Sequence, residues 1–267
     1  MRLENYLIIE GNNQSLSDKK ALEMVRSECS QAWESKTKLY RGHHSTLDNL
    51  FYDSRGIVRT SPYAKNNLYN ILLSNLPSWK RYPKRNESVI CSFAEDKAYG
   101  YNEGFYFVYP YDGLDVGICS GRDLWDSFRD VDPLNKLNRV MENVLDFMHE
   151  INEFDDYSDT KKFFARFDKW IDDPDNFEKF NQESYEEPYD FFKKIGYFEW
   201  RSPRYLRLGK LIDVLNNVLD PKYNGFKLVK AGKYPPGCDT EAWFSGPCIL
   251  MIVNPALHGA GGPRAEG

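Results

Sequence analysis

The chain has 267 residues, of which 41% are hydrophobic and 28% charged, a balance that is ordinary for a globular protein. This length allows one large domain or two small ones, and it excludes a mini-protein that needs disulfides or metals to be stable. The formal net charge of −5 argues against a protein that coats nucleic acid with its whole surface, but it leaves room for a local basic patch.

Neither a membrane anchor nor a cysteine framework is indicated. No apolar run approaches the roughly 20 residues of a membrane span, and residues 1–10 lack the regions of a signal peptide, so we expect a cytoplasmic protein without membrane contacts. The five cysteines are an odd number and lack CxxC spacing, which argues against a zinc ribbon or a disulfide framework. With only four histidines, a metal centre would need carboxylate ligands, and no spacing of acidic residues indicates them. We therefore expect no metal site.

The first half of the chain predicts a mixture of helices and strands. Ser17 is a candidate N-cap for an opening helix over 15–35. A short strand over 37–42 stops at a glycine, which predicts Arg41 at a strand end. We further expect helices over 66–76 and 94–101, and strands over 88–92, 104–110 and 115–119.

Residues 77–85 form a connector that is basic, aromatic and bounded by prolines. The plain interpretation is a solvated loop. The alternative is a surface that contacts phosphate groups.

The second half begins with helical patterns and ends with strands. Apolar residues recur at helical spacing over 133–151, and the acidic, aromatic segment 150–187 favours loops and short helices, one of them over 161–171. We expect another helix over 203–219, and strand character at 226–229, around 244 and at 248–253. The pattern predicts one α+β domain over 1–257 with a helical insertion over about 125–222, followed by a disordered tail over 258–267.

Three short motifs follow one another on the predicted strands. The first is Tyr40-Arg41-Gly42, the second contains Ser92-Phe93-Ala94, and the third contains Asp239-Thr240-Glu241 followed by three apolar residues and a Ser-Gly-Pro turn. Together they resemble the Arg-Ser-Glu class of the ADP-ribosyltransferase superfamily, in which an Arg ends one strand, a Ser-Thr-Ser strand precedes a helix containing an Ala, and a catalytic Glu opens a later strand.

The resemblance implies a split β-sandwich with flanking helices and an NAD-dependent mono-ADP-ribosyltransferase. It assigns catalysis to Arg41, Ser92 and Glu241. NAD would be the substrate and the only cofactor, and the acceptor of ADP-ribose would be a macromolecule, with a protein expected and a nucleic acid as the alternative.

The resemblance also suggests further binding residues. The residues expected to contact NAD, besides the catalytic ones, are Gly42, Phe93 and Tyr106, and those expected to recognise the acceptor are Asp239 and Tyr234. Core packing is the alternative role for each of these rings. The chain departs from the family pattern at two places: it has Ser-Phe-Ala instead of Ser-Thr-Ser, and Asp239 where relatives have Glu or Gln.

The three residue types suit the chemistry that the resemblance implies. A guanidinium offers paired donors to a pyrophosphate. Loss of nicotinamide passes through an oxocarbenium-like sugar cation, which a carboxylate such as that of Glu241 can stabilise. Ser92 would hold the carboxylate or the ribose in place. Taken alone, each residue has a plain alternative: a surface ion pair for Arg41, a backbone hydrogen bond for Ser92 and a solvated side chain for Glu241.

Two other functions remain as alternatives. One is a non-catalytic binding module on the same fold, and the other is an NAD-dependent enzyme that modifies nucleic acid, for which the connector 77–85 would supply the basic residues. The low content of Ala and the many Asn, Lys, Tyr and Asp residues are typical of a phage or low-GC bacterial protein. A phage-encoded or bacterial effector that acts in the host cytoplasm would fit this composition.

Overall fold

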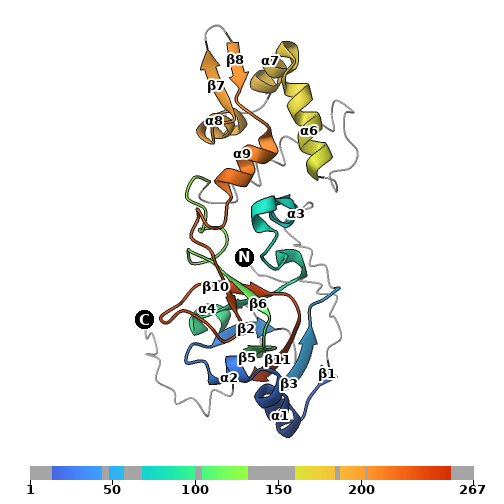
Figure 1. Ribbon diagram of the computed structural model, residues 1–267, viewed down its shortest axis with the longest axis vertical. Coiled ribbons are helices and arrows are strands. Elements are labelled where there is room, and N and C mark those ends of the chain that lie inside the picture. Colours follow the sequence, from blue (N-terminus) through green and yellow to red (C-terminus); the bar gives the residue numbers. More distant parts are fainter. Residues whose placement is uncertain are drawn as a thin grey trace, which may run out of the picture. The chain divides into compact units, whose positions relative to one another are not determined.

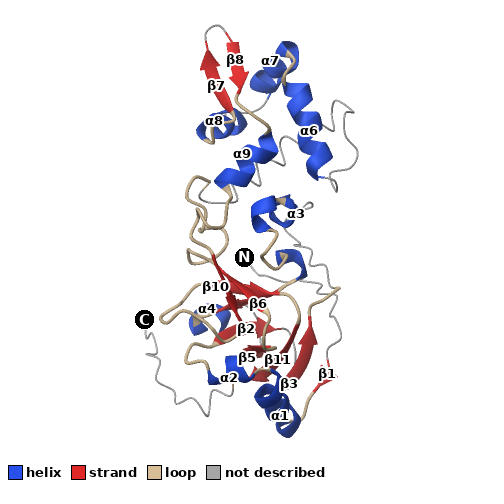
Figure 2. Cartoon of the chain, viewed as in Figure 1, coloured by secondary structure: helices blue, strands red, loops and turns tan. Residues whose placement is uncertain are grey.

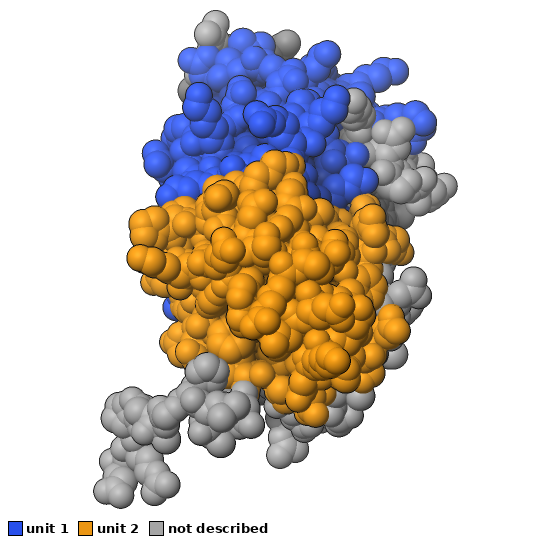
Figure 3. Space-filling view, turned by 60° about the horizontal axis from the view of Figure 1, so that its bottom comes forward, with its two compact units in different colours: residues 1–8, 58–86, 117–228 blue, residues 9–57, 87–116, 229–267 orange. Residues whose placement is uncertain are grey.

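The computed structural model describes residues 14–43, 48–56, 68–99, 104–131, 160–183, 187–201 and 204–253. They form a mixed α and β structure with a large antiparallel sheet and several helices (Figures 1 and 2). The chain divides into two compact units, coloured separately in Figure 3: unit 1 comprises residues 1–8, 58–86 and 117–228, and unit 2 comprises 9–57, 87–116 and 229–267. In the described ranges, no helix is long and apolar enough to cross a bilayer.

The large sheet supplies most of unit 2. Its strand order is β1-β3-β11-β5-β2-β4-β10-β6-β9, and the division between the units passes through β6 and β9. The strands are β1 (Gln14–Ser15), β2 (Leu39–His43), β3 (Asn49–Asp53), β4 (Val89–Ser92), β5 (Gly104–Pro110), β6 (Asp115–Ile118), β9 (Lys227–Lys230), β10 (Glu241–Phe244) and β11 (Pro247–Ile252).

The centre of this sheet has two buried faces. Leu250 of β11 lies opposite Leu50 of β3 and Val108 of β5, and all three are at most 2% exposed. On the other face, Ile249 and Tyr109 pack against helices α1 (Asp18–Glu28) and α2 (Ser30–Glu34). Because alternate residues of these strands face opposite sides, both sides need apolar residues, which explains the continuous hydrophobic run over 248–253.

The opening helix expected over 15–35 is present as two consecutive helices, α1 and α2. The side chain of Ser17 accepts a hydrogen bond from the backbone N of Lys20 and caps α1, as the sequence predicted. The chain leaves helical geometry at Cys29, whose Sγ donates to the backbone O of Tyr109. This bond ties the break between the two helices to β5.

Unit 1 combines helices with a β-hairpin. Its helices are α3 (Leu68–Asn75), α6 (Thr160–Ile171), α7 (Pro174–Glu183), α8 (Glu187–Lys194) and α9 (Leu211–Val218), and the hairpin is made of β7 (Phe198–Arg201) and β8 (Arg204–Arg207). A short 3-10 turn, η1 (Pro77–Trp79), lies in the connector, and a second, η2 (Arg85–Glu87), begins at its last residue. A short helix, α4 (Glu95–Tyr99), belongs to unit 2.

The core of unit 1 is aromatic. Phe167 of α6 is fully buried, and its ring centroid lies 5.9 Å from those of Phe180 and Phe192. Tyr197 is also fully buried and stacks on the same ring at 6.3 Å. The aromatic richness of this part of the sequence therefore serves packing.

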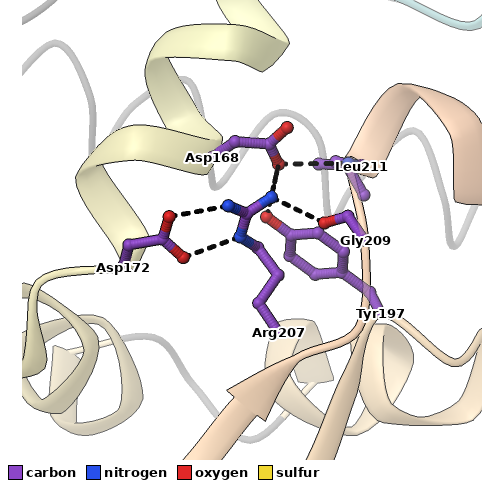
Figure 4. A network of polar contacts seen from close by, with 6 residues as sticks. All are labelled: Asp168, Asp172, Tyr197, Arg207, Gly209 and Leu211. Atoms are coloured by element: carbon purple, nitrogen blue, oxygen red, sulfur yellow. Dashed lines mark hydrogen bonds and ion pairs between the residues drawn. The ribbon is translucent and has the colours of Figure 1, made fainter.

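A polar network adjoins this core (Figure 4). The carboxylate of Asp168, on α6, accepts hydrogen bonds from the hydroxyl of Tyr197 at 2.7 Å and from the backbone N of Leu211 at 3.0 Å, at the start of α9. Arg207 of β8 lies 3.6 Å from Asp168 and forms a paired hydrogen bond with Asp172 at 2.7 and 2.6 Å. Burial, together with the hydrogen bond to Asp168, raises the pKa of Tyr197. The network joins α6, the hairpin and α9.

Two expectations need correction and others lie outside the described residues. The helix expected over 203–219 begins only at Leu211, because residues 204–207 pair with 198–201 as β8, and Gly209 separates this strand from α9. Arg41 lies in the middle of β2, which continues to His43, and not at a strand end.

The helix expected over 133–151 and the tail 258–267 fall outside the described ranges. The insertion expected over 125–222 falls within unit 1, which also takes in 58–86.

Candidate active site

The three sequence motifs lie on three neighbouring strands, β2, β4 and β10. Glu241 is directly opposite Ser92 across β10 and β4, and Ser92 is directly opposite Tyr40 across β4 and β2. Residues opposite each other in an antiparallel pair point to the same face, with Cβ atoms about 4.5–5.5 Å apart. Tyr40, Ser92 and Glu241 therefore form one row across the sheet, which we call the Ser92 row.

Glu241 opens β10 and its side chain is partly exposed. The segment before it is held from the α4 side: the backbone N of Phe93 donates to the backbone O of Thr240 at 3.0 Å, and Lys97 Nζ donates to the backbone O of Asp239 at 3.1 Å. These bonds fix where β10 begins. The carboxylate thus stands at a defined place on the edge of the row while remaining open to solvent.

Ser92 ends β4 and is 8% exposed. Its Oγ accepts a hydrogen bond from the backbone N of Ala94 at 3.0 Å, in the turn that leads into α4. A hydroxyl that accepts one bond keeps its own hydrogen to donate. The register places Glu241 directly opposite Ser92 in the neighbouring strand.

Arg41 occupies a different position. It is 8% exposed, and its Nη1 donates to the backbone O of Ile90 in β4 at 2.6 Å. Because Arg41 is adjacent to Tyr40 in β2, strand alternation directs its side chain to the face opposite the Ser92 row. On that face it lies opposite the fully buried Tyr106, and its charge acts on the buried thiol of Cys248. The structure therefore does not bring the guanidinium together with Ser92 and Glu241.

The other NAD-contact residues expected from the sequence are in the core. Tyr106 is fully buried and packs edge-on against the ring of His43, with centroids 6.1 Å apart. Phe93 is 6% exposed, and Gly42 is buried within β2. The burial of the two rings fits core packing, the alternative that the sequence left for them.

Tyr40 is an aromatic residue of the row to which the sequence motifs assigned no role. Its ring stacks on Phe105 at 5.6 Å with an interplanar angle of 7° and is only partly buried. Burial and the charge of Glu95 in α4 raise the pKa of its hydroxyl. The signal was present in the sequence, since Tyr40 precedes Arg41 and must face the other way, but only the register with Ser92 shows which residue shares the row.

The two residues expected to recognise an acceptor differ in exposure. Asp239 is exposed, two residues before Glu241. The ring of Tyr234 packs edge-on against Phe93 at 5.2 Å, and its hydroxyl is buried with no hydrogen-bond partner among the described residues. Burial raises the pKa of Tyr234, and the nearby backbone of Gly232 opposes this shift without forming a well-aligned hydrogen bond. Of the two, Asp239 is the accessible one.

The cysteines and acidic residues do not form a metal centre in the part of the chain that the structure describes, where no cluster of three or more His, Cys, Asp or Glu side chains could hold an ion. All five cysteines are free thiols. Burial raises the pKa of Cys29 and Cys248, so both are protonated at neutral pH.

No family model, curated protein or solved structure matches this chain. The functional interpretation therefore rests on the three motifs and on the geometry of the Ser92 row.

Proposed function

We propose that this protein is a mono-ADP-ribosyltransferase that cleaves NAD at the nicotinamide bond, with Glu241 as its catalytic carboxylate and a split β-sandwich of the ADP-ribosyltransferase type as its fold. One observation carries the proposal: Glu241 lies directly opposite Ser92, at the first residue of a strand, with a partly exposed carboxylate. Ser92 and Glu241 are 149 positions apart in the sequence, yet they lie opposite each other in one row of the sheet.

The chemistry assigned to the row follows from charge. As the bond between the ribose C1′ and the nicotinamide nitrogen breaks, nicotinamide leaves with the electron pair, and positive charge develops on the ribose ring. The carboxylate of Glu241 accepts a hydrogen bond from a ribose hydroxyl and stabilises that charge. A nucleophile of the acceptor then bonds to C1′ and loses its proton, which completes the transfer.

Ser92 and Tyr40 have supporting roles in this proposal. The hydroxyl of Ser92 donates to the carboxylate of Glu241 and fixes its orientation, a positioning role. The partly exposed ring of Tyr40 offers a flat apolar surface in the same row, suited to stacking on nicotinamide. Asp239, exposed next to Glu241, is the residue we assign to the acceptor, which we propose to be a protein.

A second candidate function has an observation in its favour. Arg41, expected to bind the pyrophosphate of NAD, is buried on the other face and bonded to the backbone of β4. A sheet that keeps its arginine for structure alone fits a non-catalytic module that binds a partner. The two functions differ in whether NAD is consumed.

The deciding experiment measures nicotinamide released from NAD by the purified protein. Release that is absent from an equally purified Glu241→Gln protein, but retained by a Glu199→Gln control in β7, is the expected result. Labelled NAD added to a cell lysate with the protein would then identify the acceptor by mass spectrometry. If wild-type protein and Glu241→Gln both release no nicotinamide above the protein-free background, the chain is a binding module.

A further inference from the structure

The basic connector 77–85 is folded firmly against the rest of unit 1. Trp79 is 5% exposed, and its indole Nε1 donates to the backbone O of Leu219 at 2.7 Å. The hydroxyl of Tyr82 donates to the backbone O of Phe226 at 3.2 Å. The connector is thus a structured element, and its lysines and arginines project from a fixed backbone.

The loop that follows α9 forms the second part of the same surface. Asn224 is 1% exposed, and its side-chain amide donates to the backbone O of Val218 at 2.9 Å and of Asp220 at 2.8 Å. Its Oδ1 accepts from the backbone N of Arg129 at 2.9 Å. Because Trp79 and Tyr82 contact both ends of this loop, the connector, Arg129 and the loop lie side by side within unit 1.

These segments expose cations with few acids among them. Residues 77–86 include four lysines and arginines and no acidic residue, in a chain whose net charge is −5. Four of the exposed cations of these segments are Lys80, Arg81, Arg129 and Lys222. Within the described residues none of these four forms an ion pair with a carboxylate, and the carboxylate of Asp220 is engaged by the backbone N of Tyr223 at 2.9 Å. We call this set, with Tyr223, the basic loop surface.

Tyr223 gives the surface an aromatic group. It is 49% exposed, one of the large hydrophobic side chains that remain open to solvent. The guanidinium of Arg129 lies 5.5 Å from its ring centroid. An exposed tyrosine with an arginine beside it is a platform for a nucleobase, because both groups present flat faces.

We propose that the basic loop surface binds single-stranded nucleic acid, with Lys80, Arg81 and Lys222 contacting phosphates and Tyr223 stacking on a base. This binding is separate from NAD cleavage and goes beyond the proposed function. Single-stranded nucleic acid would contact both parts of this surface, because its phosphates bind the spaced cations and its bases stack on the exposed ring. An acidic peptide would contact the cations alone. The small size of the patch fits a protein that is acidic as a whole.

The test is a titration of fluorescein-labelled oligodeoxythymidylate and oligouridylate with the full chain, read by fluorescence anisotropy at several salt concentrations. Replacing Lys80, Arg81 and Lys222 together by Ala should weaken binding about tenfold or more at low salt. It should also reduce the slope of log Kd against log salt by about 2, since each phosphate contact of a single strand contributes roughly 0.7.

A second variant separates stacking from charge. Tyr223→Ala should weaken binding about tenfold with the salt slope unchanged, because it removes a ring and no charge. The matched control replaces Lys169, Lys193 and Lys194, also exposed in unit 1, by Ala and should bind as the wild type does.

Three results would overturn the proposal. They are the absence of saturable binding to both oligonucleotides at low salt, an equal loss in the control, and competition by polyglutamate as strong as that by unlabelled oligonucleotide, which would indicate an acidic protein partner. The assay contains no NAD, and Glu241→Gln should bind the oligonucleotides as the wild type does. A failure here therefore leaves the proposed NAD chemistry untouched.

Discussion

In unit 1 a buried carboxylate, that of Asp168, is surrounded by hydrogen-bond donors, whereas in unit 2 the carboxylate of Glu241 stands partly exposed at the first residue of a strand. The first has three partners in its own unit: Tyr197, Arg207 and the backbone N of Leu211. The second is placed by strand register, and its side chain keeps part of its surface in contact with solvent. Buried, hydrogen-bonded polar groups stabilise a fold, whereas a partly exposed polar group at a defined position can act on a ligand.

Arg41 lies between these two cases. Its motif predicts a ligand contact, but its guanidinium donates to the backbone O of Ile90 and is almost fully buried. Although Arg41 lies in unit 2, its burial and its hydrogen bond make it more similar to the structural groups of unit 1 than to Glu241. Variants of these residues can therefore test whether the comparison holds.

The largest expected effect is on the stability of unit 1. Asp168→Ala should lower the free energy of unfolding by about 3–5 kcal/mol, because it leaves Tyr197, Arg207 and the first turn of α9 without their buried acceptor. Thermal and denaturant unfolding monitored by circular dichroism measure this loss. Asp172→Ala removes the exposed partner of the same arginine and should cost about 1 kcal/mol or less. Equal losses in both variants would contradict the structural role assigned to the buried carboxylate.

The next effect is on activity in unit 2. Glu241→Gln should reduce NAD cleavage about a hundredfold or more, as expected for loss of one electrostatic group that stabilises a transition state. Its melting temperature should stay close to that of the wild type, since the side chain is partly exposed. Nicotinamide release measured by chromatography, with Glu199→Gln as the control, gives the comparison. Release at the wild-type rate would show that another group stabilises the sugar cation.

Arg41→Lys should show an intermediate pattern. An ammonium cannot reproduce the geometry of the guanidinium, so the bond to the backbone of Ile90 weakens and stability should fall by about 1–3 kcal/mol. Arg55→Lys, at an exposed arginine of unit 2, is the matched control and should leave stability close to that of the wild type. Calorimetry with NAD separates the alternatives. A variant that keeps its stability but loses NAD affinity would place the guanidinium at the NAD site and contradict its structural role.

The sequence predicted local secondary structure better than it predicted which segments pair with one another. The strands over 37–42, 88–92 and 104–110 were recognisable because apolar and β-branched or aromatic residues concentrate there, and the N-cap at Ser17 needed only its own turn. The hairpin strand β8 was mistaken for helix, since its four residues become a strand only by pairing with β7.

The candidate site shows the same limit. The order of the three motifs suggested that Arg41, Ser92 and Glu241 act together, but a motif carries no information on which face of a strand it occupies until the register is known. The pairing of Ser92 with Tyr40 and Glu241 depends on contacts between distant segments. The register added Tyr40 to the candidate site and placed Arg41 on the opposite face from Ser92 and Glu241.

The smallest expected effect concerns Ser92, and it discriminates between a positioning role and a purely structural one. Its hydroxyl accepts from the backbone N of Ala94, so Ser92→Ala removes a bond of the turn as well as the proposed donor to Glu241. If positioning matters, kcat for NAD cleavage should fall about tenfold with little change in KM, since a hydrogen bond to a charged group is worth about 1.5–3 kcal/mol. Ser92→Thr keeps the hydroxyl and should restore most of the rate.

Ser88→Ala, at a buried serine just before β4, is the control for loss of a nearby hydroxyl and should leave kcat unchanged. A structural role alone would instead lower the melting temperature of Ser92→Ala and leave the kcat of the folded fraction at the wild-type value, and Glu241 would then act without help from its neighbour.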